Sequence, residues 1–149
     1  MKSLILSTGT RLLVPLILIL SAFVYWRGHN DPGGGFIGGL LAATAFALVE
    51  KAEGLAAARR ALRFRPESIA ATGLGFALVS GLWGGLGSDT FLKGVWPFYS
   101  LDAAGEKHGL PLGSIPLFDL GVYLVVLGTV TAILFALEEA VATEADRGD

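Results

Sequence analysis

Long apolar segments recur along this chain of 149 residues, and they restrict its fold more than any other feature. A helix needs about 20 mostly apolar residues to cross the hydrocarbon core of a bilayer. The third and fourth segments have no polar face at helical spacing, which a soluble helical bundle would require. The sequence therefore predicts an all-α integral membrane protein, folded as a single domain, with four transmembrane helices. These spans are expected at residues 5–26, 35–52, 69–86 and 117–137.

The composition agrees with a membrane location and excludes several classes of function. Hydrophobic residues make up 53% of the chain and charged residues only 16%, whereas about a quarter of a soluble domain is charged. Cysteine is absent, so no disulfide or thiolate metal site can form. The basic residues form no stripe that would bind nucleic acid. There is no nucleotide loop and no activated nucleophile, so we expect neither an enzyme nor a cofactor.

The basic residues predict the orientation of the spans, because Lys and Arg accumulate in short cytoplasmic loops. The connection between the second and third spans, together with Lys51 at the end of the second, carries five of the chain's 11 Lys and Arg residues. In a four-span arrangement only Arg27, Lys93 and Lys107 lie on the opposite side. We therefore expect both termini in the cytoplasm. Residues 87–116 then form a periplasmic or extracellular loop, whose aromatic residues suggest a short helix lying on the membrane surface.

A segment rich in glycine joins the first two spans, where an ordinary polar turn would suffice. Glycine adopts positive φ at no steric cost and proline fixes φ, so the segment is expected to be a turn re-entering the membrane. Glycines four residues apart also let helices approach closely, within the chain or against other subunits. A turn that caps the second helix explains His29 and Asp31 better than a metal site does. The candidates for an interface or an ion route are Pro32, Gly33, Gly34, Gly35, Phe36, Gly38 and Gly39, with His29 and Asp31 as weaker ones.

The second span is short, because its apolar part ends at Val49 and Glu50 follows at once. The helix could continue into the cytoplasm with polar residues, or Glu50 could lie within the hydrocarbon layer. Alternatively, the glycine-rich segment could dip below the headgroups, which requires cover from neighbouring protein. Snorkelling at the interface is the simplest explanation of Glu50 and Lys51. Glu50 is therefore only a weaker candidate for an ion route.

Asp119 stands at the expected start of the fourth span, two residues before Gly121. An aspartate there is expected to cap the helix, because its oxygen can accept a hydrogen bond from an unpaired backbone amide. The alternative is a buried carboxylate on an ion path, since acids inside a membrane are costly and tend to be functional. We favour the cap and keep Asp119 and Gly121 as candidate residues.

Two long motifs resemble the MnhB family, the B subunits of Mrp-type multisubunit Na+/H+ antiporters. The first is Gly-His-Asn-Asp-Pro-Gly-Gly-Gly-Phe-Ile-Gly-Gly-Leu, at residues 28–40, and the second is Phe-Asp-Leu-Gly-Val-Tyr-Leu, at residues 118–124. The resemblance covers nearly the whole chain. Lys93 and Pro116 are further candidates, although they lie outside the two motifs.

The resemblance implies a small subunit of a hetero-oligomeric antiporter in the cytoplasmic membrane. Such a complex exports Na+ in exchange for H+, driven by the proton motive force. The expected partners are the other subunits, membrane lipid and the two transported ions. An equivalent subunit of a hydrogenase-type complex related to respiratory complex I is one alternative, and a stand-alone four-helix scaffold or channel is another. Within an antiporter, the subunit could hold its neighbours together or line part of the ion route, and we favour the structural role.

Overall fold

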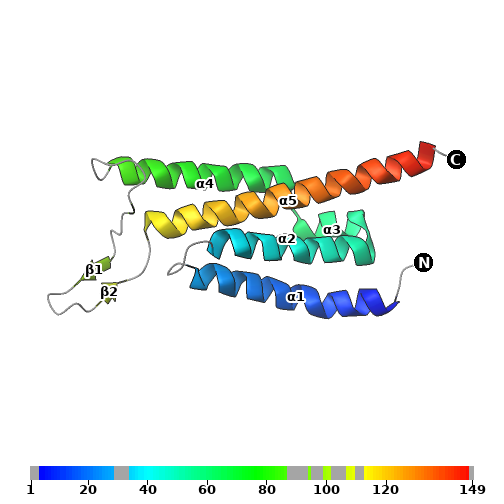
Figure 1. Ribbon diagram of the computed structural model, residues 1–149, viewed down its shortest axis with the longest axis horizontal. Helices are drawn as coiled ribbons and strands as arrows, with labels where there is room; N and C mark the ends of the chain where they lie inside the picture. The colour runs from blue at the N-terminus through cyan, green and yellow to red at the C-terminus, as the bar shows by residue number, and fades with distance from the viewer. Residues whose placement is uncertain are drawn as a thin grey trace.

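Long helices account for most of the computed structural model, which describes residues 4–28, 34–86, 94, 99–101, 107–109 and 113–147. A short antiparallel hairpin accompanies them, in which Tyr99 pairs with Gly109. The elements appear in Figure 1 in the order α1 (Leu4–Arg27), α2 (Gly34–Glu53), α3 (Leu55–Leu62), α4 (Pro66–Leu86), β1 (Tyr99–Leu101), β2 (Lys107–Gly109) and α5 (Ser114–Arg147).

The four long helices lie side by side in the order α1, α2, α5, α4 (Figure 1), so α2 and α5 are the inner pair. The short helix α3 follows α2 and packs beside its end. The start of α1 and the end of α5 lie at the same end of the molecule as α3, and the hairpin lies at the other (Figure 1). An ion pair between Arg11 of α1 and Glu53 of α2 joins these helices at the α3 end.

Among the described residues, three helices are long and apolar enough to cross a membrane: Ile5–Arg27, Gly34–Glu53 and Ser114–Ala145. The chain is therefore a helical, multi-pass membrane protein. Half of the α2 segment is buried within the protein, against 11% of the α1 segment. This difference explains why α2 is rich in Gly and Ala, since its neighbours approach it on several sides.

Several element boundaries differ from the sequence-based prediction. The helix α2 differs by only one residue at each end from the predicted 35–52, and its 20 residues span about 30 Å. Of the three alternatives for the short apolar segment, continuation of the helix through polar residues is the one observed. Gly54, with a φ of 92°, then separates α2 from α3, a helix that was not predicted. The 34 residues of α5 extend about 50 Å, well beyond residues 117–137, and carry the acidic tail as helix.

The described parts of residues 87–116 differ from the predicted loop. Residues 114–116 belong to α5, because the helix begins at Ser114. Tyr99–Leu101 and Lys107–Gly109 are strands, so this part of the loop contains a hairpin. The rest of the loop, where the short surface helix was expected, lies outside the described residues.

The helices α4 and α5 touch through their backbones. A Cβ atom on Gly73 would lie 2.6 Å from the Gly121 carbonyl oxygen and 2.7 Å from the Val125 nitrogen. A Cβ atom on Gly121 would likewise lie 2.7 Å from the Ala77 nitrogen. These separations are too short for real atoms, so the interface depends on glycine. By contrast, a Cβ atom on Gly75 would have nothing within 4 Å.

This difference predicts opposite effects for two substitutions in one helix. Gly73→Ala should destabilise the protein by about 1–3 kcal/mol, because the new methyl group meets the α5 backbone, which cannot rotate away. Gly75→Ala should be neutral or stabilising by up to ~1 kcal/mol, since alanine is the better helix former. The thermal midpoint of the detergent-solubilised protein measures both. Equal midpoints for the two variants would show that α4 and α5 are not in backbone contact.

Candidate functional site

The two sequence motifs meet in space at the end of the bundle that carries the hairpin. The backbone N–H of Gly35 donates a hydrogen bond to Asp119 Oδ1 over 2.9 Å. The two residues are 84 positions apart. The contact joins the first turn of α2 to the first part of α5.

Helix geometry explains why this contact forms. The first amides of a helix have no partner within it, and the helix dipole favours negative charge nearby. The first turn of α2 contains no acidic residue, and Gly33, which precedes it in the sequence, has no side chain. Asp119 of α5 supplies the missing acceptor.

The expectation that Asp119 caps its own helix is therefore wrong. Because α5 begins at Ser114, Asp119 lies inside it, where the amides already have intrahelical partners. Its carboxyl group caps α2 instead. The second oxygen, Oδ2, is buried and makes no hydrogen bond with the described residues.

The glycines of the first motif allow this approach. A Cβ atom on Gly35 would overlap the backbone oxygen of Asp119. A Cβ atom on Gly39 would lie 2.6 Å from the Tyr123 oxygen, and one on Gly38 would lie 3.1 Å from the Tyr123 ring. Gly34 is equally crowded by the backbone of Gly28. The glycines thus pack within the chain, as the simpler of the two sequence interpretations held.

Polar side chains that the sequence analysis did not select connect α1 to α2 and α5. Ser21 of α1 donates to the Gly38 oxygen over 2.7 Å and lies 2.8 Å from the Tyr123 hydroxyl. The Tyr25 hydroxyl donates to the Pro116 oxygen over 3.2 Å, and its ring meets the Tyr123 ring edge-on with centroids 5.6 Å apart. Such hydrogen bonds join helices where lipid provides no hydrophobic drive. The sequence signal that could have identified this contact is Ser21, a lone serine within an apolar segment.

The remaining candidates divide into three groups. Pro116 is buried, and Gly121 faces α4 rather than α2. Phe36 is 54% exposed on the outside of the bundle. The others, His29, Asp31, Pro32, Gly33 and Lys93, lie outside the described residues.

Glu50 belongs to a separate, charged cluster at the opposite end of α2. Its residue is only 4% exposed, so snorkelling explains Lys51 but not Glu50. The Lys51 ammonium group lies 3.2 Å from Glu50 Oε1 and hydrogen-bonds to Glu138 Oε2 over 2.9 Å. Lys51 and Glu138 are exposed to solvent, so their pair contributes little to stability.

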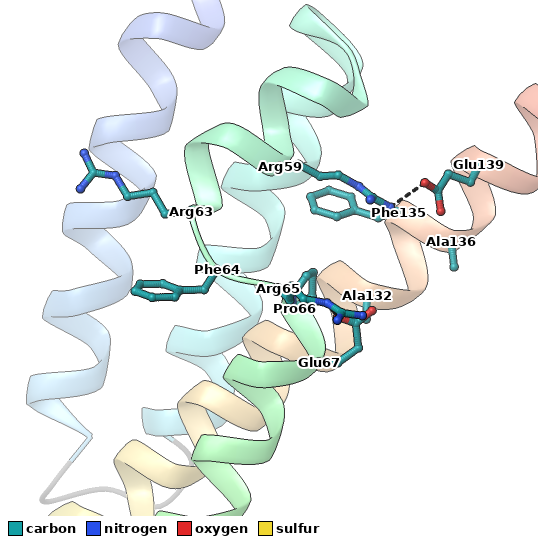
Figure 2. Close-up of a pocket in the computed structure, with 10 residues that line it drawn as sticks. All are labelled: Arg59, Arg63, Phe64, Arg65, Pro66, Glu67, Ala132, Phe135, Ala136 and Glu139. Atoms are coloured by element: carbon teal, nitrogen blue, oxygen red, sulfur yellow. Dashed lines mark hydrogen bonds and ion pairs between the residues drawn. The ribbon is translucent and has the colours of Figure 1, made fainter.

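A pocket of about 410 Å³ opens beside this cluster, between the α3–α4 connection and α5 (Figure 2). Arg59 extends across it and pairs with Glu139 over 2.7 Å. The pocket is therefore lined by a neutralised pair as well as by further arginines. Its lining comprises Arg59, Arg63, Phe64, Arg65, Pro66, Glu67, Ala132, Phe135, Ala136 and Glu139.

Known proteins resemble this chain in both sequence and fold. Residues 5–132 match the family model described as a domain related to the MnhB subunit of Na+/H+ antiporter. The chain is 36% identical to the B subunit of the Na+/H+ antiporter of Alkalihalophilus pseudofirmus, with 91% of this chain and 92% of that protein covered. It is 35% identical to the Bacillus subtilis protein of the same name, with 93% and 94% covered.

A solved structure of the Mrp complex from Dietzia sp. contains a similar fold, with a TM-score of 0.71 and 33% identity. The match covers 90% of this chain but only 14% of the matched chain, which is much larger. The family model and the full-length relatives agree with this structural likeness. From its sequence and its helical fold, the chain belongs to the MnhB family of antiporter subunits.

Proposed function

We propose that this chain is the B-type subunit of an Mrp-type multisubunit antiporter that exports Na+ in exchange for H+ across the cytoplasmic membrane. The names of its full-length relatives and the likeness to part of an Mrp complex support this role. They favour an antiporter over a hydrogenase-type complex or a stand-alone channel. The subunit is a transporter component rather than an enzyme.

The proposed arrangement has four spans, with α4 as the third. Support comes from the 21 residues of α4 and from its glycine-mediated packing along α5. Both termini are proposed to be cytoplasmic. The basic α3 region lies at the same end of the bundle as the start of α1 and the end of α5 (Figure 1), as the distribution of Lys and Arg would require.

A structural role is the first function that we propose for this subunit. The hydrogen bond from Gly35 to Asp119 carries this proposal, because it joins both family motifs within one chain. A bundle fixed in this way presents a constant outer surface to the neighbouring subunits. Phe36, which follows Gly35 and is 54% exposed, belongs to that surface.

Participation in the ion route is a second candidate function, and one specific observation favours it. Asp119 Oδ2 is buried without a hydrogen bond among the described residues. A buried acid within a membrane is costly and tends to bind ions or protons. Carboxylate and carbonyl oxygens also suit cation selection. Asp119 therefore combines an α2 cap with an oxygen available for a transported ion.

The structural role predicts that Gly35→Ala disrupts the complex. The new methyl group would overlap Asp119, and overpacking of this kind costs about 1–3 kcal/mol. Native gels of the solubilised complex should show less of the assembled form. Gly9→Ala is the matched control, because a Cβ atom on Gly9 in α1 has nothing within 4 Å. Normal assembly of the Gly35→Ala complex combined with lost transport would contradict the structural role.

Substitutions of Asp119 separate the two roles. Asp119→Asn keeps an oxygen that can accept from Gly35, so the complex should assemble. Asp119→Ala removes the acceptor and should lose about 1.5–3 kcal/mol, with visible loss of the complex. If Asp119 also contacts the ion, the assembled Asp119→Asn complex should show an altered apparent Na+ affinity in everted vesicles. An unchanged affinity removes Asp119 from the ion route and leaves the cap as its role.

A further inference from the structure

The arginines at the α3–α4 connection are unequally neutralised. Arg59 pairs with Glu139 over 2.7 Å, and Arg65 lies 3.8 Å from Glu67. Within the part of the chain that the structure describes, Arg63 has no carboxylate in ion-pair contact. This guanidinium group is therefore open to an external anion.

The backbone directs Arg63 away from the neighbouring ion pair. Arg63 has a φ of 64°, in the left-handed region, and its N–H donates to the Arg59 oxygen over 3.2 Å. This conformation ends α3 and turns the chain sharply. Figure 2 shows the Arg63 and Phe64 side chains pointing away from Arg59 and Glu139, toward the side of α1.

An apolar groove begins at Phe64, whose exposed fraction is 71%. It has a volume of about 290 Å³ and is lined by Phe64, Ser68, Ile69, Thr72 and Leu124. Ser68 and Thr72 are one helical turn apart in α4, so the groove follows one side of this helix away from Phe64. The Thr72 hydroxyl donates to the Ser68 oxygen over 2.8 Å, which leaves its methyl group for the groove.

We propose that Arg63 and this groove bind one anionic phospholipid. The phosphate lies against the Arg63 guanidinium group, and an acyl chain follows the groove along α4. Among the described residues Arg60 of α3 also lacks a carboxylate partner, but its Nε donates to the Ala56 oxygen of its own helix. Arg63 is the unpaired cation next to Phe64, where the groove begins. A cation at the start of an apolar groove matches an amphiphile with one anionic head. The cytoplasmic leaflet is rich in anionic lipid, and basic residues at its surface attract such headgroups.

The site rests on the proposed placement of α4 as a span with its first turn at the cytoplasmic face. This placement puts Arg63 at the depth of the headgroups and Thr72 within the hydrocarbon layer. A segment of a neighbouring subunit is the competing occupant, and the experiment separates the two.

Native mass spectrometry of the assembled complex tests the proposal by titration with dioleoyl phosphatidylglycerol. Arg63→Gln should weaken binding of one lipid about fivefold, as expected for the loss of one basic residue at an anionic surface. Arg65→Gln is the matched control. It removes the same charge two residues further along the chain, but Arg65 is already paired with Glu67. The control should therefore leave the lipid affinity nearly unchanged. Dioleoyl phosphatidylcholine, whose choline offsets the phosphate charge, should lose less affinity on Arg63→Gln than dioleoyl phosphatidylglycerol does.

The groove has its own test. Dioleoyl phosphatidylglycerol should bind more tightly than the dihexanoyl form, whose chains are too short to reach Thr72, and Phe64→Ala should weaken the binding of the dioleoyl form. This comparison also tests the site if Arg63→Gln prevents assembly. Assembly and Na+/H+ exchange are measured on the same preparations, so loss of lipid alone is distinguished from failure of the antiporter role.

Three outcomes would overturn the proposal. Equal losses in Arg63→Gln and Arg65→Gln would indicate diffuse electrostatic attraction. Displacement of the lipid by inorganic phosphate at equal concentration would indicate a free-anion site. Cross-linking of Thr72→Cys to another subunit in the native membrane would show that protein fills the groove.

Discussion

The close approach of α2 to α5 is the constraint on which the rest of the structure depends. Lipid is as apolar as the helix surfaces, so association in a membrane relies on backbone proximity and hydrogen bonds. Gly35 and Gly39 let α2 come within contact of Asp119 and Tyr123, and the Gly35 amide then finds its acceptor. A side chain on either glycine would separate the helices and break that hydrogen bond. The inner position of α2 follows from the same small residues.

The two ends of the bundle use different physical means of joining the helices. Toward the hairpin end, hydroxyl groups such as those of Ser21 and Tyr123 connect α1, α2 and α5. At the α3 end, ion pairs such as that of Lys51 with Glu138 connect α2 to α5. Individual exposed pairs contribute little, so the hairpin end supplies more of the specificity.

Family membership and geometry together narrow the question of mechanism. The described residues of the two motifs make contacts within the chain: the glycines let α5 approach α2, and Asp119 caps α2. A residue that holds the fold can still take part in transport, since Asp119 Oδ2 has no hydrogen bond among the described residues. The outward surface, including Phe36, is separate from these contacts. The proposed roles in assembly and in ion contact therefore fall on different atoms of a small region.

The sequence by itself determined the helical membrane class, because apolar segments of this length have few other stable forms. Its two motifs also sufficed for the MnhB family. Local rules failed at Asp119, since the sequence could not reveal that a helix 84 residues away lacked an acceptor. Apolar length likewise underestimated α5, which continues as helix beyond residue 137 through a charged segment whose Glu138 pairs with Lys51 of α2. Only the tertiary structure decided which glycines are indispensable: Gly73 meets a backbone, whereas Gly75 in the same helix meets nothing, and spacing along a chain does not show what lies opposite.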